Sequence, residues 1–162
     1  MAEVLYPTPE WLEESLKAFG PEFENKLKSL SGHFGYHIMA DPKFGIEKDL
    51  YMSMVLEAGK LTRLEHYSEE DAKKEADFIM GATPPVWKRI LQKLDKFVGA
   101  FMGGRIKLEK GDTVGALALG PHANTLVDCL TQITLKFPDD LSPDEFESYK
   151  AAFAEYRANK GV

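Results

Sequence analysis

The chain has 162 residues, of which 44% are hydrophobic and 28% charged, and this composition is typical of a soluble globular protein. Its length predicts a single domain over residues 1–162, long enough to bury about 68–70% of the surface that the unfolded chain exposes. The formal net charge of −6 argues against nucleic-acid binding, which requires a basic surface, and the single cysteine, Cys129, excludes an internal disulfide.

Two helices are predicted at the start of the chain. Thr8-Pro9 is a helix cap followed by proline at the first helical position, and it predicts an N-terminal helix over residues 8–19. Gly20-Pro21 then ends that helix and begins another, whose apolar residues lie at helical spacing.

From Gly32 the apolar period changes to two, which predicts strands. Phe34, Tyr36 and Ile38 alternate with smaller or polar residues. Residues 50–56 and 61–67 form two further strands, joined by the short turn Glu57-Ala58-Gly59-Lys60 into a hairpin.

The segment after the hairpin mixes strands and helices. Residues 75–80 are predicted as a strand, and Thr83 with Pro84 predicts the start of a helix. Asp95 is expected to cap a second, short helix that ends at Gly103-Gly104, and residues 105–109 are predicted as the last strand.

The remainder of the chain is predicted to be helical. After Asp112, apolar residues are spaced four, three and four apart at Leu126, Leu130, Ile133 and Phe137. Ser142 begins a capping box for a C-terminal helix over residues 142–158. This aromatic helix has three possible roles: it packs on the domain, covers a ligand entrance as a lid, or forms a homodimer contact.

The central motifs have an order found in a known family. They are Ala76-Asp77-Phe78-Ile79-Met80, Trp87 to Leu91, Ala100-Phe101-Met102-Gly103-Gly104, Arg105-Ile106-Lys107-Leu108 and Gly111-Asp112. This order of strand, helix, short helix, strand and helix resembles the sterol-carrier-protein type 2 family. The resemblance covers residues 20–135 and is strongest over residues 75–119.

The resemblance implies an α+β fold in which helices cover a five-stranded, mainly antiparallel sheet and enclose an apolar tunnel. The core is expected over residues 20–137, with extra N- and C-terminal helices. Such domains bind sterols, fatty acids, fatty acyl-CoA or phospholipids without changing them chemically. The implied function is carriage of apolar ligands inside the cell, without catalysis and without a cofactor.

Candidate ligand-binding residues are the bulky apolar side chains of this region. Methionine suits a wall that adapts to ligands of different shape, although the same residues could simply fill a core. The candidates are Met52, Met54, Leu56, Phe78, Trp87, Ile90, Leu91, Phe97, Phe101 and Met102. Burying a sixteen-carbon chain contributes about 12 kcal/mol, and association costs about 4–15 kcal/mol, so micromolar binding needs no polar anchor.

No catalytic or metal site is predicted. His33 and His37 would lie about 13 Å apart on a strand and cannot share one metal ion. Cys129 lies beside the apolar stripe of its helix, which predicts an inert, packed thiol.

The basic residues suggest one possible partner. Residues 88–110 carry a charge of +5, so the rest of the chain carries −11. Lys88, Arg89, Lys93, Lys96 and Arg105 could make transient contact with an anionic membrane surface, or form an ordinary solvated face.

The N-terminal sequence lacks the basic start and apolar run of a secretory signal, so a cytoplasmic location is expected. A second interpretation of the function remains open. The protein could be an accessory protein that presents an apolar substrate to a separate enzyme of lipid, steroid or hydrocarbon breakdown.

Overall fold

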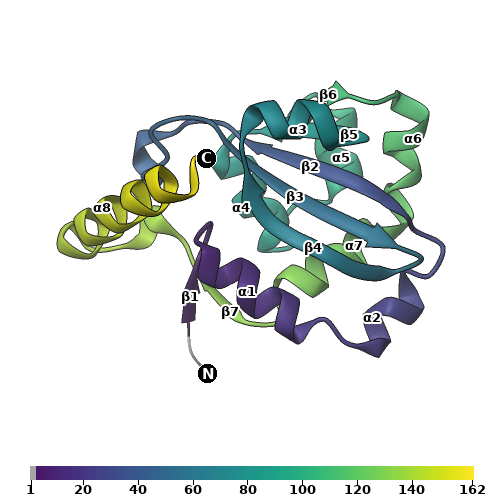
Figure 1. Cartoon of the computed structure of the whole chain (residues 1–162), viewed down its shortest axis with the longest axis horizontal. Helices are drawn as coiled ribbons and strands as arrows, with labels where there is room; N and C mark the ends of the chain where they lie inside the picture. Colours follow the sequence, from purple (N-terminus) through teal and green to yellow (C-terminus); the bar gives the residue numbers. More distant parts are fainter. Residues whose placement is uncertain (1–2) are drawn as a thin grey trace.

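The computed structural model describes residues 3–162, and a five-stranded sheet forms the centre of the molecule (Figure 1). The strand order is β4-β3-β2-β5-β6, and neighbouring strands are antiparallel except for the parallel pair β2 and β5. The predicted α+β class and mainly antiparallel sheet are therefore confirmed. The strands are β2 (Gly32–Ile38), β3 (Leu50–Glu57), β4 (Lys60–Tyr67), β5 (Phe78–Ala82) and β6 (Lys107–Lys110).

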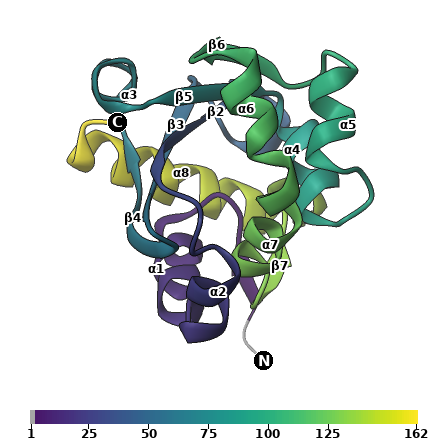
Figure 2. The same ribbon diagram turned by 90° about the vertical axis from the view of Figure 1, so that its right-hand side faces the viewer.

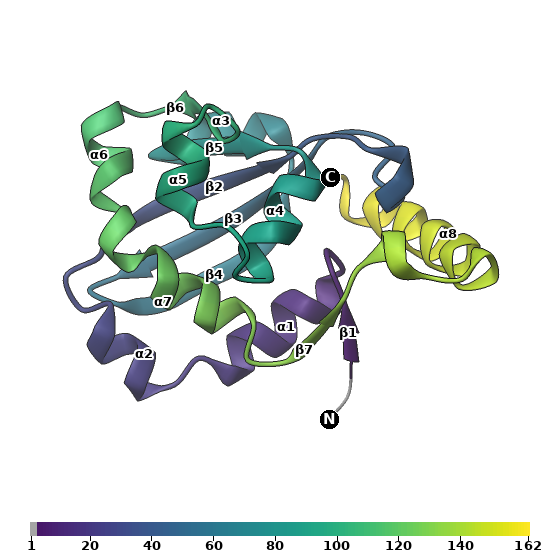
Figure 3. The same ribbon diagram turned by 180° about the vertical axis from the view of Figure 1, so that it is seen from behind.

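The two faces of the sheet pack against different helices. In β3, Leu50, Met52, Met54 and Leu56 are all buried on one face, as the alternation predicts. In front of this face lie α4 (Pro84–Leu91), α5 (Phe97–Met102), α6 (Thr113–Ala118) and α7 (Gly120–Leu130), as Figure 3 shows. The opposite face, which includes Tyr51, packs against α3 (Glu69–Glu75).

The N-terminal segment closes the edge of the molecule beside β4. α1 (Pro9–Ala18) and α2 (Pro21–Lys26) lie beyond that strand (Figure 2). Before them, β1 (Glu3–Leu5) pairs in parallel with β7 (Thr134–Lys136) in a separate two-stranded sheet. The Trp11 indole N–H donates to the carbonyl of Leu130 at 2.9 Å, which ties α1 to the end of α7.

The C-terminal helix α8 (Pro143–Lys160) packs on the domain. Its predicted capping box at Ser142 is present. The Tyr149 hydroxyl donates to the carbonyl of Phe44 at 2.9 Å, within the short 3-10 helix Pro42–Phe44. A second 3-10 helix, Pro138–Asp140, connects β7 to α8.

Some predicted elements were wrong. Ile133 and Phe137 are not helical, because α7 ends at Leu130 and the following residues form β7. Asp95 does not cap α5, which begins at Phe97. Its carboxylate instead pairs with Arg89 at 2.7 Å and with Arg105 at 2.9 Å.

Two strand boundaries were also displaced. β5 begins at Phe78 rather than residue 75, because Glu75 ends α3, a helix that the sequence pattern did not predict. β6 begins at Lys107 rather than residue 105, because the loop after α5 extends to Ile106. Within residues 3–162, no helix combines the length and the apolar character that crossing a membrane requires.

Candidate functional site

An apolar cavity of about 60 Å³ lies between the central sheet and its covering helices. Its walls come from the N-terminal segment, β2, β3, α4, α5 and α7. None of the lining residues carries a formal charge. They are Tyr6, Trp11, Tyr36, Ile38, Met52, Trp87, Ile90, Leu91, Phe97, Leu119, Ala123, Leu126, Val127 and Leu130.

Regular secondary structure places these side chains. Tyr36 and Ile38 are two residues apart on β2 and therefore share a face with Met52 of the neighbouring strand. On α4, Trp87, Ile90 and Leu91 lie three and four residues apart, so they project from one side of the helix. The lining residues of α7 follow the same spacing.

The two indole rings of the cavity are held by hydrogen bonds. The Trp87 N–H donates to the carbonyl of His37 at 3.1 Å, and the Trp11 N–H donates to Leu130 as described above. Trp87 also meets the Tyr36 ring edge-on, with ring centroids 5.7 Å apart. Because both indole donors are satisfied within the protein, the tryptophans offer mainly apolar surface to the cavity.

Half of the predicted ligand-binding residues line this cavity: Met52, Trp87, Ile90, Leu91 and Phe97. Met54 and Leu56 are buried in the same core but do not border the cavity, and Phe78 and Phe101 pack partly buried against that core. Met102 is 69% exposed and lies away from the cavity.

Sequence reasoning missed the residues that line the cavity from the N-terminal segment and from α7. Tyr6 and Trp11 belong to a segment that the prediction treated as an addition to the domain. Leu126 and Leu130 were recognised as an apolar stripe, and their spacing could have placed α7 against the cavity. Tyr36 and Ile38 could have been found by the alternation of β2.

The cavity is small compared with typical ligand pockets, which hold about 300–1,000 Å³. A long-chain ligand can therefore enter only if the walls move apart. Met52 is unbranched and adaptable, and most of the other side chains that line the cavity make only apolar, non-directional contacts. These side chains can move apart without breaking polar bonds, while the hydrogen bonds of Trp11 and Trp87 hold the two indole rings.

Two tyrosine hydroxyls of the cavity residues have little or no hydrogen bonding. Among the described residues, the Tyr6 hydroxyl is buried without a partner, and the Tyr36 hydroxyl reaches only the Met54 sulfur, at 3.8 Å. Burial raises the pKa of Tyr6, with a further contribution from Tyr149, and burial likewise raises the pKa of Tyr36. Both hydroxyls therefore stay neutral.

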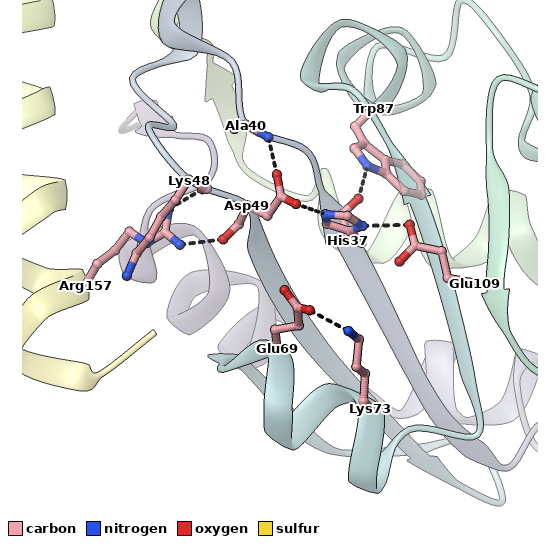
Figure 4. A network of polar contacts seen from close by, with 9 residues as sticks. All are labelled: His37, Ala40, Lys48, Asp49, Glu69, Lys73, Trp87, Glu109 and Arg157. Carbon is pink, nitrogen blue, oxygen red and sulfur yellow. Dashed lines mark hydrogen bonds and ion pairs between the residues drawn. The ribbon is translucent and has the colours of Figure 1, made fainter.

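The other face of the sheet carries a polar network (Figure 4). The His37 ring lies between two carboxylates, with Nδ1 2.6 Å from Glu109 and Nε2 3.0 Å from Asp49. It stacks on Tyr51 with ring centroids 4.4 Å apart and is only 7% exposed. The imidazole is therefore held by the Tyr51 ring and by the two neighbouring carboxylates.

Cys129 and the possible metal ligands are the other groups with potential for chemistry. Burial raises the pKa of the Cys129 thiol to about 12, so the thiol is protonated and unreactive at neutral pH. Over the part of the chain that the structure describes, no group of three or more histidine, cysteine, aspartate or glutamate side chains could hold a metal ion.

Comparison of the sequence with protein-family models and with curated proteins found no match. Solved structures do match. A protein of Thermus thermophilus, described as a candidate sterol carrier protein, superposes with a TM-score of 0.67 at 22% identity, over 80% of this chain and 90% of that one. A crystal structure of sterol carrier protein 2 superposes with a TM-score of 0.61, also at 22% identity, over 76% of this chain and 92% of that one.

These superpositions define the class of fold. The chain has the fold of sterol carrier protein 2, and the predicted resemblance is confirmed at the level of the fold.

Proposed function

We propose that this protein binds apolar ligands in the cavity between its sheet and helices and carries them without chemical change. The proposal rests on the wall of the cavity, which is uncharged and almost wholly apolar. Helices from both halves of the chain build this wall over one face of the sheet. The fold shared with sterol carrier protein 2 supports the same function. Sterols, fatty acids, fatty acyl chains of CoA esters and phospholipid acyl chains are the ligand classes expected.

We propose that the five predicted residues at the cavity, Met52, Trp87, Ile90, Leu91 and Phe97, contact the ligand together with the apolar residues of α7. An apolar chain gains about 0.8 kcal/mol for each CH₂ group that it buries there. Since one methylene contributes so little, the cavity is expected to tolerate ligands of different lengths.

Native mass spectrometry of the purified protein, followed by solvent extraction and lipid analysis, tests the function directly. A retained apolar molecule supports the proposal and identifies its class. A protein that carries nothing and also fails to bind a fluorescent fatty acid contradicts it.

A matched pair of variants tests the location. Ala123 lines the cavity, whereas Ala118 is exposed on α6. Ala123→Leu fills space that the ligand needs, and we expect it to weaken fluorescent fatty-acid binding at least tenfold. Ala118→Leu adds the same atoms outside the cavity and should leave binding unchanged. Equal effects of the two variants would place the ligand elsewhere.

A further inference from the structure

The large apolar side chains that are exposed on the described part of the chain come mostly from one stretch of sequence. They are Leu94, Val98, Met102, Val114 and Leu117, together with Leu16 on α1. Single exposed apolar residues are normal on a protein surface, but a group of them on one face marks an interaction site. Met102 is 69% exposed and Val114 is 80% exposed, so neither side chain contributes much to the packing of the domain.

Four of these side chains share one surface. Val98 and Met102 are four residues apart on α5, and Val114 and Leu117 are three apart on α6, so each pair projects from one side of its helix. Figure 3 shows α5 and α6 side by side in front of the sheet, and Figure 2 shows the same neighbours from another side. A Cβ atom on Gly120, two residues after the end of α6, would lie 2.8 Å from the Val98 side chain. The four residues therefore form a continuous surface, the α5–α6 face.

The segments that form this face lack the negative charge of the rest of the chain. Residues 96–108 contain three basic residues and no acidic one, and residues 113–127 contain no aspartate, glutamate, lysine or arginine. Between these two segments, the Asp112 carboxylate accepts from the N–H of Gly115 and caps α6. In a chain with a net charge of −6, this face therefore carries little negative charge.

Cations at the edge of α5 remain available to an anionic partner. Lys96 is exposed at the start of α5 and makes no ion pair with another described residue. Arg89 and Arg105 share the single carboxylate of Asp95, so this group of three keeps a charge of +1. Both arginine side chains are about half exposed, whereas that of Asp95 is 20% exposed, so the positive groups are the ones turned toward solvent.

This combination fits a lipid surface better than a second copy of the chain. Exposed apolar side chains enter the boundary between headgroups and acyl chains, while neighbouring lysine and arginine side chains stay beside anionic headgroups. Two copies that met through this face in a symmetric dimer would instead bring the same cations together, which disfavours such a dimer.

We propose that the α5–α6 face docks on anionic membrane surfaces, with its four apolar side chains in the interfacial region and with Lys96 and Arg105 beside the headgroups. This inference goes beyond the proposed function, because it assigns an interaction surface outside the cavity.

A tryptophan placed on the face tests the insertion. Met102→Trp and Leu16→Trp form a matched pair, because each replaces an exposed apolar side chain, on α5 or on α1. The probe is vesicles of phosphatidylcholine with about one-third phosphatidylserine, carrying bromine on the acyl chains as a quencher. We expect quenching and a blue shift of the added tryptophan in Met102→Trp and neither in Leu16→Trp. The natural tryptophans, Trp11 and Trp87, are buried and give a constant background.

Cosedimentation with unlabelled vesicles of the same lipids tests the contribution of each kind of residue. Met102→Gln/Val114→Thr removes apolar surface without changing the charge, and we expect it to weaken binding about fivefold or more. Lys96→Gln should also weaken binding, by about fivefold at low salt and less at high salt. Leu16→Gln is the control and should bind as the natural protein does. All of these side chains are exposed, so the variants are expected to fold normally.

Three results would overturn this inference. The first is a natural protein that does not bind these vesicles. The second is binding in which Met102→Trp is not quenched or Met102→Gln/Val114→Thr is as tight as the natural protein. The third is a change of mass in solution in Met102→Gln/Val114→Thr, measured by analytical ultracentrifugation, which would make the face a contact between two copies. The proposed function stands in each case, because ligand retention is measured without vesicles.

Discussion

Gly81 shows how one missing side chain permits the polar network on the outer face of the sheet. A Cβ atom at this position would collide with the Glu109 carboxylate and come within 3.0 Å of His37 Nδ1. The close pair of His37 and Glu109 therefore depends on glycine in β5. No sequence pattern revealed this requirement, because the two partners lie 72 residues apart.

We expect Gly81→Ala to destabilise the protein by about 1–3 kcal/mol, since it displaces Glu109 and leaves buried His37 poorly paired. Gly99→Ala is the matched control. A Cβ there meets nothing within 4 Å, and alanine in a helix should stabilise by about 0.5–1 kcal/mol. Urea unfolding of both variants measures the difference. A neutral Gly81→Ala would contradict the proposed dependence.

His66 gives the stability a defined pH dependence. Burial, with smaller contributions from Arg157 and Lys160, lowers the pKa of His66 to about 3 from an ordinary value of 6.5. The unfolded chain therefore binds a proton that the folded protein excludes. The stability from this histidine is complete above pH 6.5 and is lost progressively as the pH falls from 6.5 toward 3.

We expect the free energy of unfolding to fall, through His66 alone, by about 1 kcal/mol per pH unit between pH 6 and pH 5. His66→Gln should remove this part of the slope, whereas His122→Gln on α7 should keep it. Urea titrations at pH 7, 6 and 5 provide the measurement. If the free energy of unfolding falls equally steeply with pH in the natural protein and in His66→Gln, His66 is not held neutral in the folded protein.

At the scale of elements, local pattern predicted those parts whose apolar residues repeat at a clear period. The hairpin of β3 and β4 and the capped helix α8 are examples. The pattern missed α3, whose sequence EEDAKKE buries only Ala72 and so shows no apolar stripe. It also missed β1 and β7, because three-residue strands that pair across about 130 residues leave no local signal.

The docking of α8 depends on a buried guanidinium. Arg157 is 6% exposed, and it donates to the carbonyls of Lys48 at 2.7 Å and Asp49 at 2.6 Å (Figure 4). Asp49 in turn contacts His37, whose carbonyl accepts from the cavity residue Trp87. The helix is thereby connected to the cavity wall through a chain of polar contacts.

We expect Arg157→Ala to lower the free energy of unfolding by about 2–3 kcal/mol, because it removes two charge-assisted hydrogen bonds made by a buried guanidinium. Lys160→Ala, one turn later at the surface, should change it by no more than about 0.5 kcal/mol. Urea unfolding compares the two. Similar small losses would indicate that α8 is only loosely attached.

At the scale of the whole molecule, the cavity was partly predictable because the family resemblance pointed to residues 75–119. Trp87, Ile90, Leu91 and Phe97 come from that region and do line it. Met102 does not, because it lies on the outer side of α5, and a six-residue helix is too short for its pattern to show which side faces inward. The wall formed by Tyr6 and Trp11 depends on the tertiary path of the chain.

The basic segment is largely neutralised by the fold. Lys88 pairs with Asp139 at 2.9 Å and Asp140 at 3.0 Å, and Lys93 pairs with Asp128 at 2.8 Å. Arg89 and Arg105 share Asp95, as described above. The net positive charge that this surface presents to a membrane is therefore smaller than +5, the formal charge of residues 88–110.

We expect weak, salt-sensitive association with anionic vesicles, and stronger association for the double variant Asp95→Asn/Asp128→Asn, which frees three cations. The control, Asp144→Asn/Glu147→Gln on α8, changes the net charge equally but far from this segment in sequence. Vesicle cosedimentation at low and high salt is the measurement. Equal enhancement by both double variants would assign the effect to net charge alone.

The pairing of β1 with β7 also affects how the protein is made. Residues 3–5 are synthesised before their partners at residues 134–136, which are added about 130 residues later. At about 5–20 residues per second, that delay is roughly 7–26 s. Throughout this time Tyr6 and Trp11 have no α7 or β7 to pack against. The nascent chain therefore carries an incomplete apolar surface until residues 134–136 have been made, and a segment that is synthesised early reaches its native place late.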